Sequence, residues 1–246
     1  MKWIRTGLFY GLWFFVIIFW ALFILLMYLV PYRVRHYVAT YWADSTIRLL
    51  RVICGVDWHV TGLEHLPTAP AIIAVNHQST WETVFTPTLL RRQLWVVKKE
   101  LVRIPVFGWA MAALRPIAID RSQKKAAMIQ VIEQGKEKIE QGYSLVMFPE
   151  GHRFPPDAPL QFRLGAARLA KALNVPIVPI AHNAGQFWPR RGLIHEGTVQ
   201  VCIGAAFLPE NYQTPETLNA ALEDWVRQKR DDIVQAEKIR RGENGA

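Results

Sequence analysis

The chain has 246 residues, 51% of them hydrophobic, and carries a formal net charge of +9. This length accommodates one large α/β domain, or one domain with a membrane segment. The positive charge indicates an acidic partner, which is nucleic acid, anionic lipid headgroups or a phosphorylated substrate.

A membrane-anchoring segment is predicted over residues 7–30, because no charged residue occurs there. A helix of that length reaches roughly 36 Å, more than the hydrocarbon core of a bilayer. A secretory signal is the competing interpretation, but it needs a shorter apolar region and a small-residue cleavage site. Pro31, Tyr32 and Arg33 follow instead, so the sequence predicts that the segment is retained.

The charges around this segment indicate its orientation. Four arginines follow it, at positions 33, 35, 48 and 51, whereas only Lys2 and Arg5 precede it. This excess predicts that the rest of the chain is on the cytoplasmic side of the membrane. Residues 37–53 form a second helical stretch that charges interrupt, so we expect it to be interfacial. A single span and a hairpin entering one leaflet remain alternatives. The predicted domains are an anchor with interfacial helix at 1–55, a catalytic domain at 56–240 and a flexible tail at 241–246.

From residue 56 the chain alternates short β-branched runs with longer mixed stretches, which predicts an α/β fold. We expect strands at residues 57–61, 71–76, 94–97, 116–120, 144–148, 175–181 and 198–203. We expect helices at residues 80–91, 106–113, 122–141, 162–173 and 215–236.

The first candidate site follows the apolar strand 71–75, where Asn76 and His77 come next and Glu82 lies five residues after the histidine. Ligands bind at the carboxyl ends of strands in open α/β sheets. His77 is therefore a candidate general base that Glu82 orients. The alternative is that Ser79 and Glu82 form a capping box, which would make Glu82 a helix cap and His77 a loop residue.

A second candidate site follows the strand 144–148. Gly151 allows a sharp turn, and Arg153 presents a planar fork that suits a phosphate. Glu150 is predicted to brace that arginine or to contact a substrate hydroxyl. The alternative is a surface turn with a local ion pair.

Cations follow two further strands. Lys98 and Lys99 come after the strand 94–97, and Arg121 comes after the strand 116–120. Each of these basic residues, taken alone, would be only the solvated end of a strand. Because cations follow three different strands, we expect them to form one basic rim along the edge of the sheet. With the His77 and Glu82 pair beside a membrane anchor, this rim indicates acyl transfer onto a phosphorylated, lipid-like alcohol.

In motif order and spacing, residues 60–206 resemble the 1-acyl-sn-glycerol-3-phosphate (lysophosphatidic acid) acyltransferases of the glycerolipid acyltransferase family. The resemblance rests on four blocks, Asn-His-Gln-Ser-Thr-Trp-Glu at 76–82, Lys-Lys-Glu-Leu to Ile-Asp-Arg at 98–121, Phe-Pro-Glu-Gly-His-Arg at 148–153 and Val-Pro-Ile-Val-Pro-Ile at 175–180. It implies a mixed, mostly parallel sheet flanked by helices. It also implies phosphatidic acid synthesis at the cytoplasmic face of the inner membrane, by a monomer that binds membrane lipids.

The resemblance also implies roles for the site residues. His77 and Glu82 would activate the sn-2 hydroxyl of the lysophospholipid, which attacks the thioester of acyl-CoA or acyl-carrier protein. Arg153, Arg121 and one of Lys98 or Lys99 would hold the phosphate. Glu150, Gly151 and Asn76 would contact substrate or shape the turn. Neither a cofactor nor a metal is implied. Residues 95, 107, 109, 111 and 114 (Trp95, Phe107, Trp109, Met111 and Leu114) are available to line an acyl channel.

Two positions depart from the family pattern. Glu82 replaces the usual aspartate, and residues 150–154 read Glu-Gly-His-Arg-Phe where the family has Glu-Gly-Thr-Arg-Ser. The threonine and serine hydroxyls of the family pattern are absent here, so the identity of the acceptor lipid stays open. A lyso-ornithine lipid is the alternative acceptor.

Other functions fit less well. A nucleic-acid-binding protein would cluster its basic residues on one face with aromatics, and the aromatics here concentrate in the anchor. A hydrolase using Ser79 or Ser144 lacks the Gly-x-Ser-x-Gly elbow. Cys54 and Cys202, the only cysteines, lie far apart, which excludes a disulfide framework. The other histidines lack ligand spacing, and we expect a surface or structural role for His36, His59, His65, His182 and His195.

Overall fold

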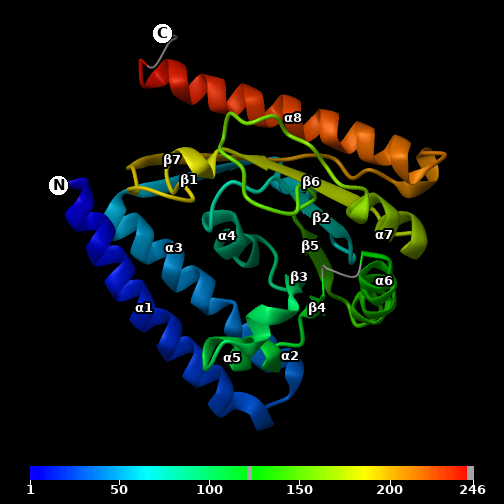
Figure 1. Ribbon diagram of the computed structural model, residues 1–246, viewed down its shortest axis with the longest axis horizontal. Helices are drawn as coiled ribbons and strands as arrows, with labels where there is room; N and C mark the ends of the chain where they lie inside the picture. The colour runs from blue at the N-terminus through cyan, green and yellow to red at the C-terminus, as the bar shows by residue number, and fades with distance from the viewer. Residues whose placement is uncertain (121–123, 243–246) are drawn as a thin grey trace.

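A computed structural model describes residues 1–120 and 124–242. Within these residues a seven-stranded sheet has the order β1-β7-β6-β2-β5-β3-β4 (Figure 1). Strands β6, β2, β5, β3 and β4 are mutually parallel, whereas β7 is antiparallel to β6 and parallel to β1. The predicted mixed, mostly parallel sheet is confirmed. Its strands are β1 (Val56–Thr61), β2 (Ile72–Val75), β3 (Gln93–Lys98), β4 (Ile117–Ile119), β5 (Ser144–Met147), β6 (Ile177–His182) and β7 (Gly197–Ile203).

Helices cover both faces of the sheet, and β2 shows why. Ile73 and Val75 pack into one buried cluster with residues of the first, third and fourth helices, whereas Ile72 and Ala74 pack into another with residues of the last three. Successive side chains of a strand point to opposite faces, so a strand covered on both sides is apolar throughout. The helices are α1 (Lys2–Leu26), α2 (Tyr32–Ala39), α3 (Tyr41–Cys54), α4 (Trp81–Leu89), α5 (Phe107–Ala113), α6 (Lys124–Glu140), α7 (Gly165–Leu173) and α8 (Pro215–Arg240).

Several helix boundaries differ from the expectation. Helix α4 ends at residue 89 and not at 91, and α7 begins at residue 165 and not at 162. The stretch predicted at 37–53 is two helices, because α2 ends before Thr40 and α3 begins after it. Helix α8 continues four residues beyond the predicted end at 236. Arg240 and Arg241 both donate to the Glu237 carboxylate. Cations in the last turn also stabilise the carboxyl end of a helix, which explains the extension.

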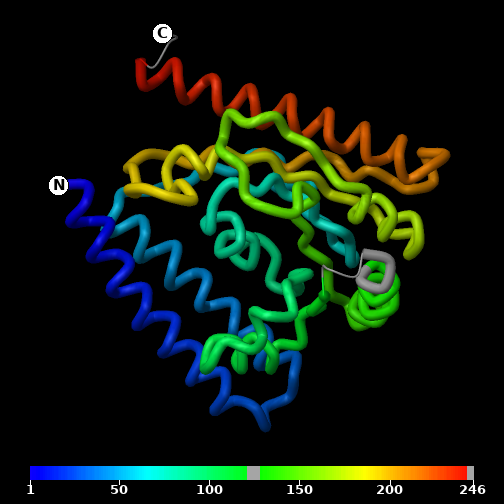
Figure 2. Tube along the Cα trace, viewed as in Figure 1, coloured from blue at the N-terminus to red at the C-terminus, as the bar shows by residue number. Residues whose placement is uncertain are grey.

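Helix α1 runs along α3 and is long and apolar enough, by length and composition, to cross a membrane (Figure 2). Near its start, Arg5 pairs with Glu196 at 2.9 Å and the Thr6 hydroxyl accepts from the Ile194 N–H. Near its end, Ile24 packs in a buried cluster with α5. Both ends of α1 therefore contact the α/β domain. Its outward side carries exposed large apolar residues, which include Phe14, Phe15, Phe19, Leu22 and Leu26.

Candidate active site

The His77 and Glu82 side chains form a hydrogen-bonded pair at the carboxyl end of β2. The Nδ1 atom of His77 lies 2.7 Å from Oε1 of Glu82, and the two side chains are 13% and 1% exposed. The imidazole also stacks on the Phe148 ring, with ring centroids 4.1 Å apart. Because Nδ1 is engaged, Nε2 is the nitrogen left to act on a substrate.

The same carboxylate also begins helix α4. Oε1 of Glu82 accepts from the backbone N–H of Gln78 at 2.9 Å and of Ser79 at 2.8 Å. These groups precede the first turn of the helix, where N–H donors lack partners within the helix. One carboxylate therefore orients the histidine and accepts two N–H groups just before the helix. The predicted capping box is not complete, because the N-cap is Thr80, which makes no side-chain cap bond, and the Ser79 hydroxyl accepts from the Trp81 N–H.

A second imidazole lies on the other side of this carboxylate. His182, the last residue of β6, places Nε2 at 3.8 Å from Oε2 of Glu82 and at 2.8 Å from the Asn76 carbonyl oxygen. The Ala184 N–H donates to its Nδ1, so Nε2 carries the ring proton. Burial lowers the pKa of His182, which keeps the ring neutral. Burial raises the pKa of Glu82, but the hydrogen bonds that the carboxylate accepts from His77 and from the Ser79 backbone oppose this, and the net shift is downward, so this carboxyl stays ionised.

Asn76 holds β2 and β6 together at this point. Its amide donates to the His182 carbonyl at 3.0 Å and accepts from the His182 N–H at 2.9 Å. The residue is 0% exposed. Its amide is thus occupied by the backbone, and it positions the residues around the His77 pair. The sequence analysis placed His182 among structural histidines and missed its proximity to Glu82; the signal available was that it follows an apolar strand.

The loop after β5 supports the backbone of His77. Oε1 of Glu150 accepts from the His77 N–H at 2.6 Å, and the Phe154 N–H donates to the His77 carbonyl at 2.9 Å. Gly151 has φ of 80°, and a Cβ there would lie 3.1 Å from the Arg163 guanidinium, so glycine is required on both counts. Among the described residues, Glu150 therefore bonds to the backbone of His77 and not to the side chain of Arg153, which was the expected partner.

Burial raises the pKa of Glu150 from 4.5 to about 7. The unfolded chain therefore releases this proton near pH 4.5 and the folded protein releases it near pH 7, so the stabilisation is present at low pH and is lost as pH rises through this window. Relative to Glu150→Gln, the free energy of unfolding of the wild type should fall by about 3 kcal/mol between these pH values. Denaturant unfolding of both proteins across pH measures this, and parallel curves would contradict it.

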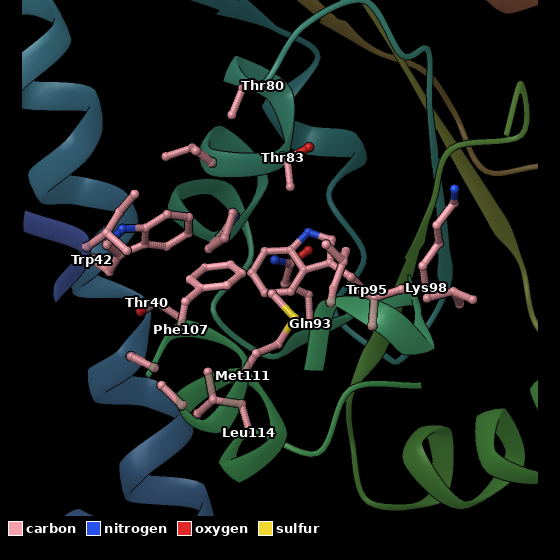
Figure 3. Close-up of a pocket in the computed structure, with 18 of the residues that line it drawn as sticks. Thr40, Trp42, Thr80, Thr83, Gln93, Trp95, Lys98, Phe107, Met111 and Leu114 are labelled. Atoms are coloured by element: carbon pink, nitrogen blue, oxygen red, sulfur yellow. The ribbon is translucent and has the colours of Figure 1, made fainter. Parts of the chain in front are cut away.

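A cavity of about 600 Å³ opens beside His77. Figure 3 shows its walls, which come from α3 and the residue before it, from the start of α4, from β3 and from α5. The lining is mostly apolar or aromatic. Trp95, Phe107, Met111 and Leu114 line it, as expected, whereas Trp109 does not and is 54% exposed. Positions 107, 111 and 114 share one face of α5, and position 109 points away from that face.

The basic residues predicted at the site also divide into those that line the cavity and those that do not. Lys98, Arg153 and Arg190 line the cavity, whereas Lys99 does not. Consecutive residues at a strand end point to opposite sides, which separates Lys98 from Lys99. Among the described residues Arg153 has no hydrogen bond or ion pair, so its guanidinium is available to an anion. Arg121 lies outside the described residues, and nothing in the sequence distinguished Arg190 from an ordinary loop arginine.

Part of the cavity wall comes from the N-terminal helices. Trp13 and Trp20 of α1, His36 of α2 and Trp42 of α3 line it together with the α/β domain. The segment predicted as an anchor therefore also builds the site. Within residues 1–120 and 124–242, no group of three or more histidine, cysteine or carboxylate side chains is arranged to hold a metal.

The sequence of this chain is similar to those of enzymes that transfer acyl groups. The sequence model of the acyltransferase family matches residues 57–183. A 1-acyl-sn-glycerol-3-phosphate acyltransferase of Pseudomonas aeruginosa is 42% identical over 83% of this chain and 81% of its own length. A chloroplastic enzyme of that name from Arabidopsis thaliana is 29% identical over 70% of this chain, which spans about half (49%) of the plant protein.

A solved structure has the same fold. The 1-acyl-sn-glycerophosphate acyltransferase of Thermotoga maritima superimposes with a TM-score of 0.77, covering 94% of this chain and 97% of its own. The two sequences are 22% identical, so this likeness concerns the fold alone.

Proposed function

The chain belongs to the acyltransferase family, and from this premise we propose that it acylates the sn-2 hydroxyl of 1-acyl-sn-glycerol-3-phosphate to give phosphatidic acid. The acyl donor is a thioester, acyl-CoA or acyl-carrier protein. The observation that carries the proposal is the His77 and Glu82 pair at the edge of an apolar cavity that Lys98 and Arg153 also line. An apolar cavity suits the acyl chain, and the cations suit the phosphate.

The chemistry follows from the orientation of the imidazole. Nε2 of His77 takes the proton of the acceptor hydroxyl as that oxygen attacks the thioester carbonyl carbon. A C–O bond forms, the C–S bond breaks, and the imidazolium returns its proton to the leaving thiolate. Glu82 holds the tautomer and stabilises the imidazolium. Neither a metal nor a cofactor enters this scheme.

Substrate binding divides between the two parts of the cavity. Each methylene that leaves water contributes about 0.8 kcal/mol, so the apolar wall favours a long acyl chain. The free guanidinium of Arg153 and the ammonium of Lys98 supply charge-assisted hydrogen bonds to the acceptor phosphate. Arg121, by its place after β4, is proposed to join them.

The membrane arrangement is part of the proposal. A helix that crossed the bilayer would not keep both ends against one domain, whereas both ends of α1 contact the α/β domain. We therefore place α1 in one leaflet with its exposed apolar side toward lipid. The arginines that follow α1 favour the cytoplasmic face of the inner membrane, where the enzyme would act as a monomer.

The test is transfer from labelled acyl-CoA and acyl-carrier protein to a panel of lysolipids, with products identified by mass spectrometry. The panel contains lysophosphatidic acid, lysophosphatidylcholine and a lyso-ornithine lipid, which lacks the phosphate. We expect phosphatidic acid as the main product. Faster acylation of the lyso-ornithine lipid would overturn the assignment of the acceptor, and the absence of any acylated lipid would overturn the activity.

Arg153→Ala should raise the KM for lysophosphatidic acid by roughly one to two decades and change kcat little. Each hydrogen bond between charged groups contributes about 1.5–3 kcal/mol, which gives this range. The matched control is Lys99→Ala, which removes a cation from the same rim but outside the cavity. Steady-state kinetics with varied acceptor measure both. Equal KM values for Arg153→Ala and the wild type would show that this arginine does not hold the phosphate.

A further inference from the structure

Gln93 is an unusual residue for an apolar cavity wall. It is the first residue of β3, lines the cavity and is 1% exposed. Neither Oε1 nor Nε2 of its amide has a hydrogen-bond partner among the described residues. Buried polar groups are nearly always paired, and each unpaired one costs about 1–3 kcal/mol. An amide with both ends unpaired therefore indicates a partner that the protein itself does not supply.

Trp95 adds a third unpaired atom. It lies two residues after Gln93, so both side chains project from the same face of β3. Its indole Nε1 is also buried without a partner among the described residues. Figure 3 shows both side chains among the apolar residues of the cavity. The cavity wall thus offers one acceptor, Oε1 of Gln93, and two donors, Nε2 of Gln93 and Nε1 of Trp95.

These atoms lie far from the reacting groups. Lys98 is at the other end of β3, and at about 3.3 Å per residue its Cα is roughly 16 Å from that of Gln93. In Figure 3 the Lys98 amine points away from the apolar side chains. Gln93 pairs with Ser144 at the amino end of β5, whereas His77 follows the carboxyl end of β2, which pairs in register with β5. A ligand group that meets Gln93 is therefore distant from the thioester carbon as well as from the headgroup.

Among the described residues, the lysine and arginines that line the cavity are Lys98, Arg153 and Arg190, and Lys98 is at the opposite end of β3 from Gln93. Arg91, which donates to the lining residue Thr40, is paired with Asp44. His36 lines the same cavity, is 5% exposed and packs on the Tyr143 ring at 4.8 Å. Burial lowers the pKa of His36 to about 4, against a weaker opposing effect of a bond to the Gln93 backbone, so its ring is neutral. An anionic ligand group would find no counter-charge in these neighbours. A neutral group that both donates and accepts fits better.

We propose that Gln93 and Trp95 form a binding site for a hydroxyl group carried on the acyl chain, well beyond the carbons next to the thioester. A hydroxyl can both donate and accept, so it can donate to Oε1 of Gln93 or accept from the N–H groups of Gln93 Nε2 and Trp95 Nε1. This inference rests on the proposed function, since it names the class of acyl donor for that site. An unsubstituted chain leaves the three atoms unpaired, unless water accompanies it.

The test compares octadecanoyl-CoA with hydroxyoctadecanoyl-CoA isomers whose hydroxyl is moved along the chain, using the full-length protein and lysophosphatidic acid. One mid-chain isomer should have a kcat/KM about 10- to 100-fold above that of the unsubstituted donor. The 3-hydroxy isomer, whose hydroxyl is beside the thioester, should show no such advantage. Transfer of none of these chains, either from CoA or from acyl-carrier protein, would contradict the proposed function itself, whereas equal transfer of all of them would contradict only this inference.

Variants of the wall make the assignment specific. Gln93→Met keeps the size of the side chain without its polar atoms and should abolish the preference for the mid-chain isomer. Trp95→Phe keeps an aromatic ring without Nε1 and should reduce that preference, which provides a second test if the first variant does not fold. The matched control is Gln141→Met, an exposed glutamine at the end of α6. A preference for the mid-chain isomer that survives both wall variants would overturn the site. The site would also be overturned if the wild type showed no preference and Gln93→Met transferred the unsubstituted chain faster, because that result would indicate that Gln93 binds only water.

Discussion

Replacing His77 with alanine is expected to lower kcat by roughly two to four orders of magnitude, the usual contribution of a positioned proton acceptor. The effect should appear in kcat because the imidazole takes the proton as the acceptor oxygen attacks. Residual transfer would come from the substrates that the cavity still brings together. Initial rates with saturating donor and acceptor measure it, and retention of more than about a tenth of wild-type activity would refute the role.

Folding has to be separated from catalysis in this test. Alanine keeps the backbone bonds of His77 to Glu150 and Phe154, and after the imidazole is lost the Glu82 carboxylate still accepts from two backbone N–H groups. We therefore expect the thermal unfolding temperature of His77→Ala to stay close to that of the wild type. His59→Ala is the matched control, since this histidine is exposed on β1 at the far edge of the sheet. It should retain full activity.

Glu82→Gln is expected to have the second-largest effect, a fall in kcat of about 10²- to 10⁴-fold. Glutamine keeps the length of the side chain and an oxygen that can accept from the N–H groups of Gln78 and Ser79. It removes the negative charge that stabilises the imidazolium of His77. Activity should therefore fall much more than stability does. Kinetics and thermal unfolding of the same preparation measure the two effects.

Two further variants help to distinguish a catalytic role of Glu82 from a structural one. Glu82→Asp keeps the charge and should recover much of the activity lost in Glu82→Gln, provided that the start of α4 accommodates the shorter side chain. Glu196→Gln is the control for loss of a carboxylate, because Glu196 is 66% exposed and pairs with Arg5 away from the site. If Glu82→Gln lost stability in proportion to activity, Glu82 would be a helix cap and not part of the catalytic pair.

Much of the site was predictable because it depends on short stretches of chain. His77 and Glu82 lie within one turn between β2 and α4, so their spacing already brings the side chains together. Gly151 was predictable as a turn residue for the same reason. The lining by Phe107, Met111 and Leu114 follows helical periodicity, which also places Trp109 outside, although the sequence analysis grouped all four.

Residues that the sequence analysis misjudged are those whose partners lie far along the chain. Glu150 was expected to contact Arg153, but it bonds to His77, which lies 73 residues away. Arg190 reaches the cavity from the loop after β6, and Trp13, Trp20 and Trp42 reach it from the N-terminal helices. No local pattern distinguishes such residues from surface arginines or from lipid-facing tryptophans.

By itself the sequence determined the α/β class, the ends of the strands and the histidine–carboxylate pair, because periodicity and turn chemistry are local properties. Only the tertiary structure decided that β6 lies beside β2, which brings His182 to the far oxygen of Glu82. It alone also decided that α1 and α3 close the cavity and that Gln93 lies unpaired within it. Strand order and helix packing depend on which distant apolar surfaces bury one another, and many pairings are compatible with the same local pattern.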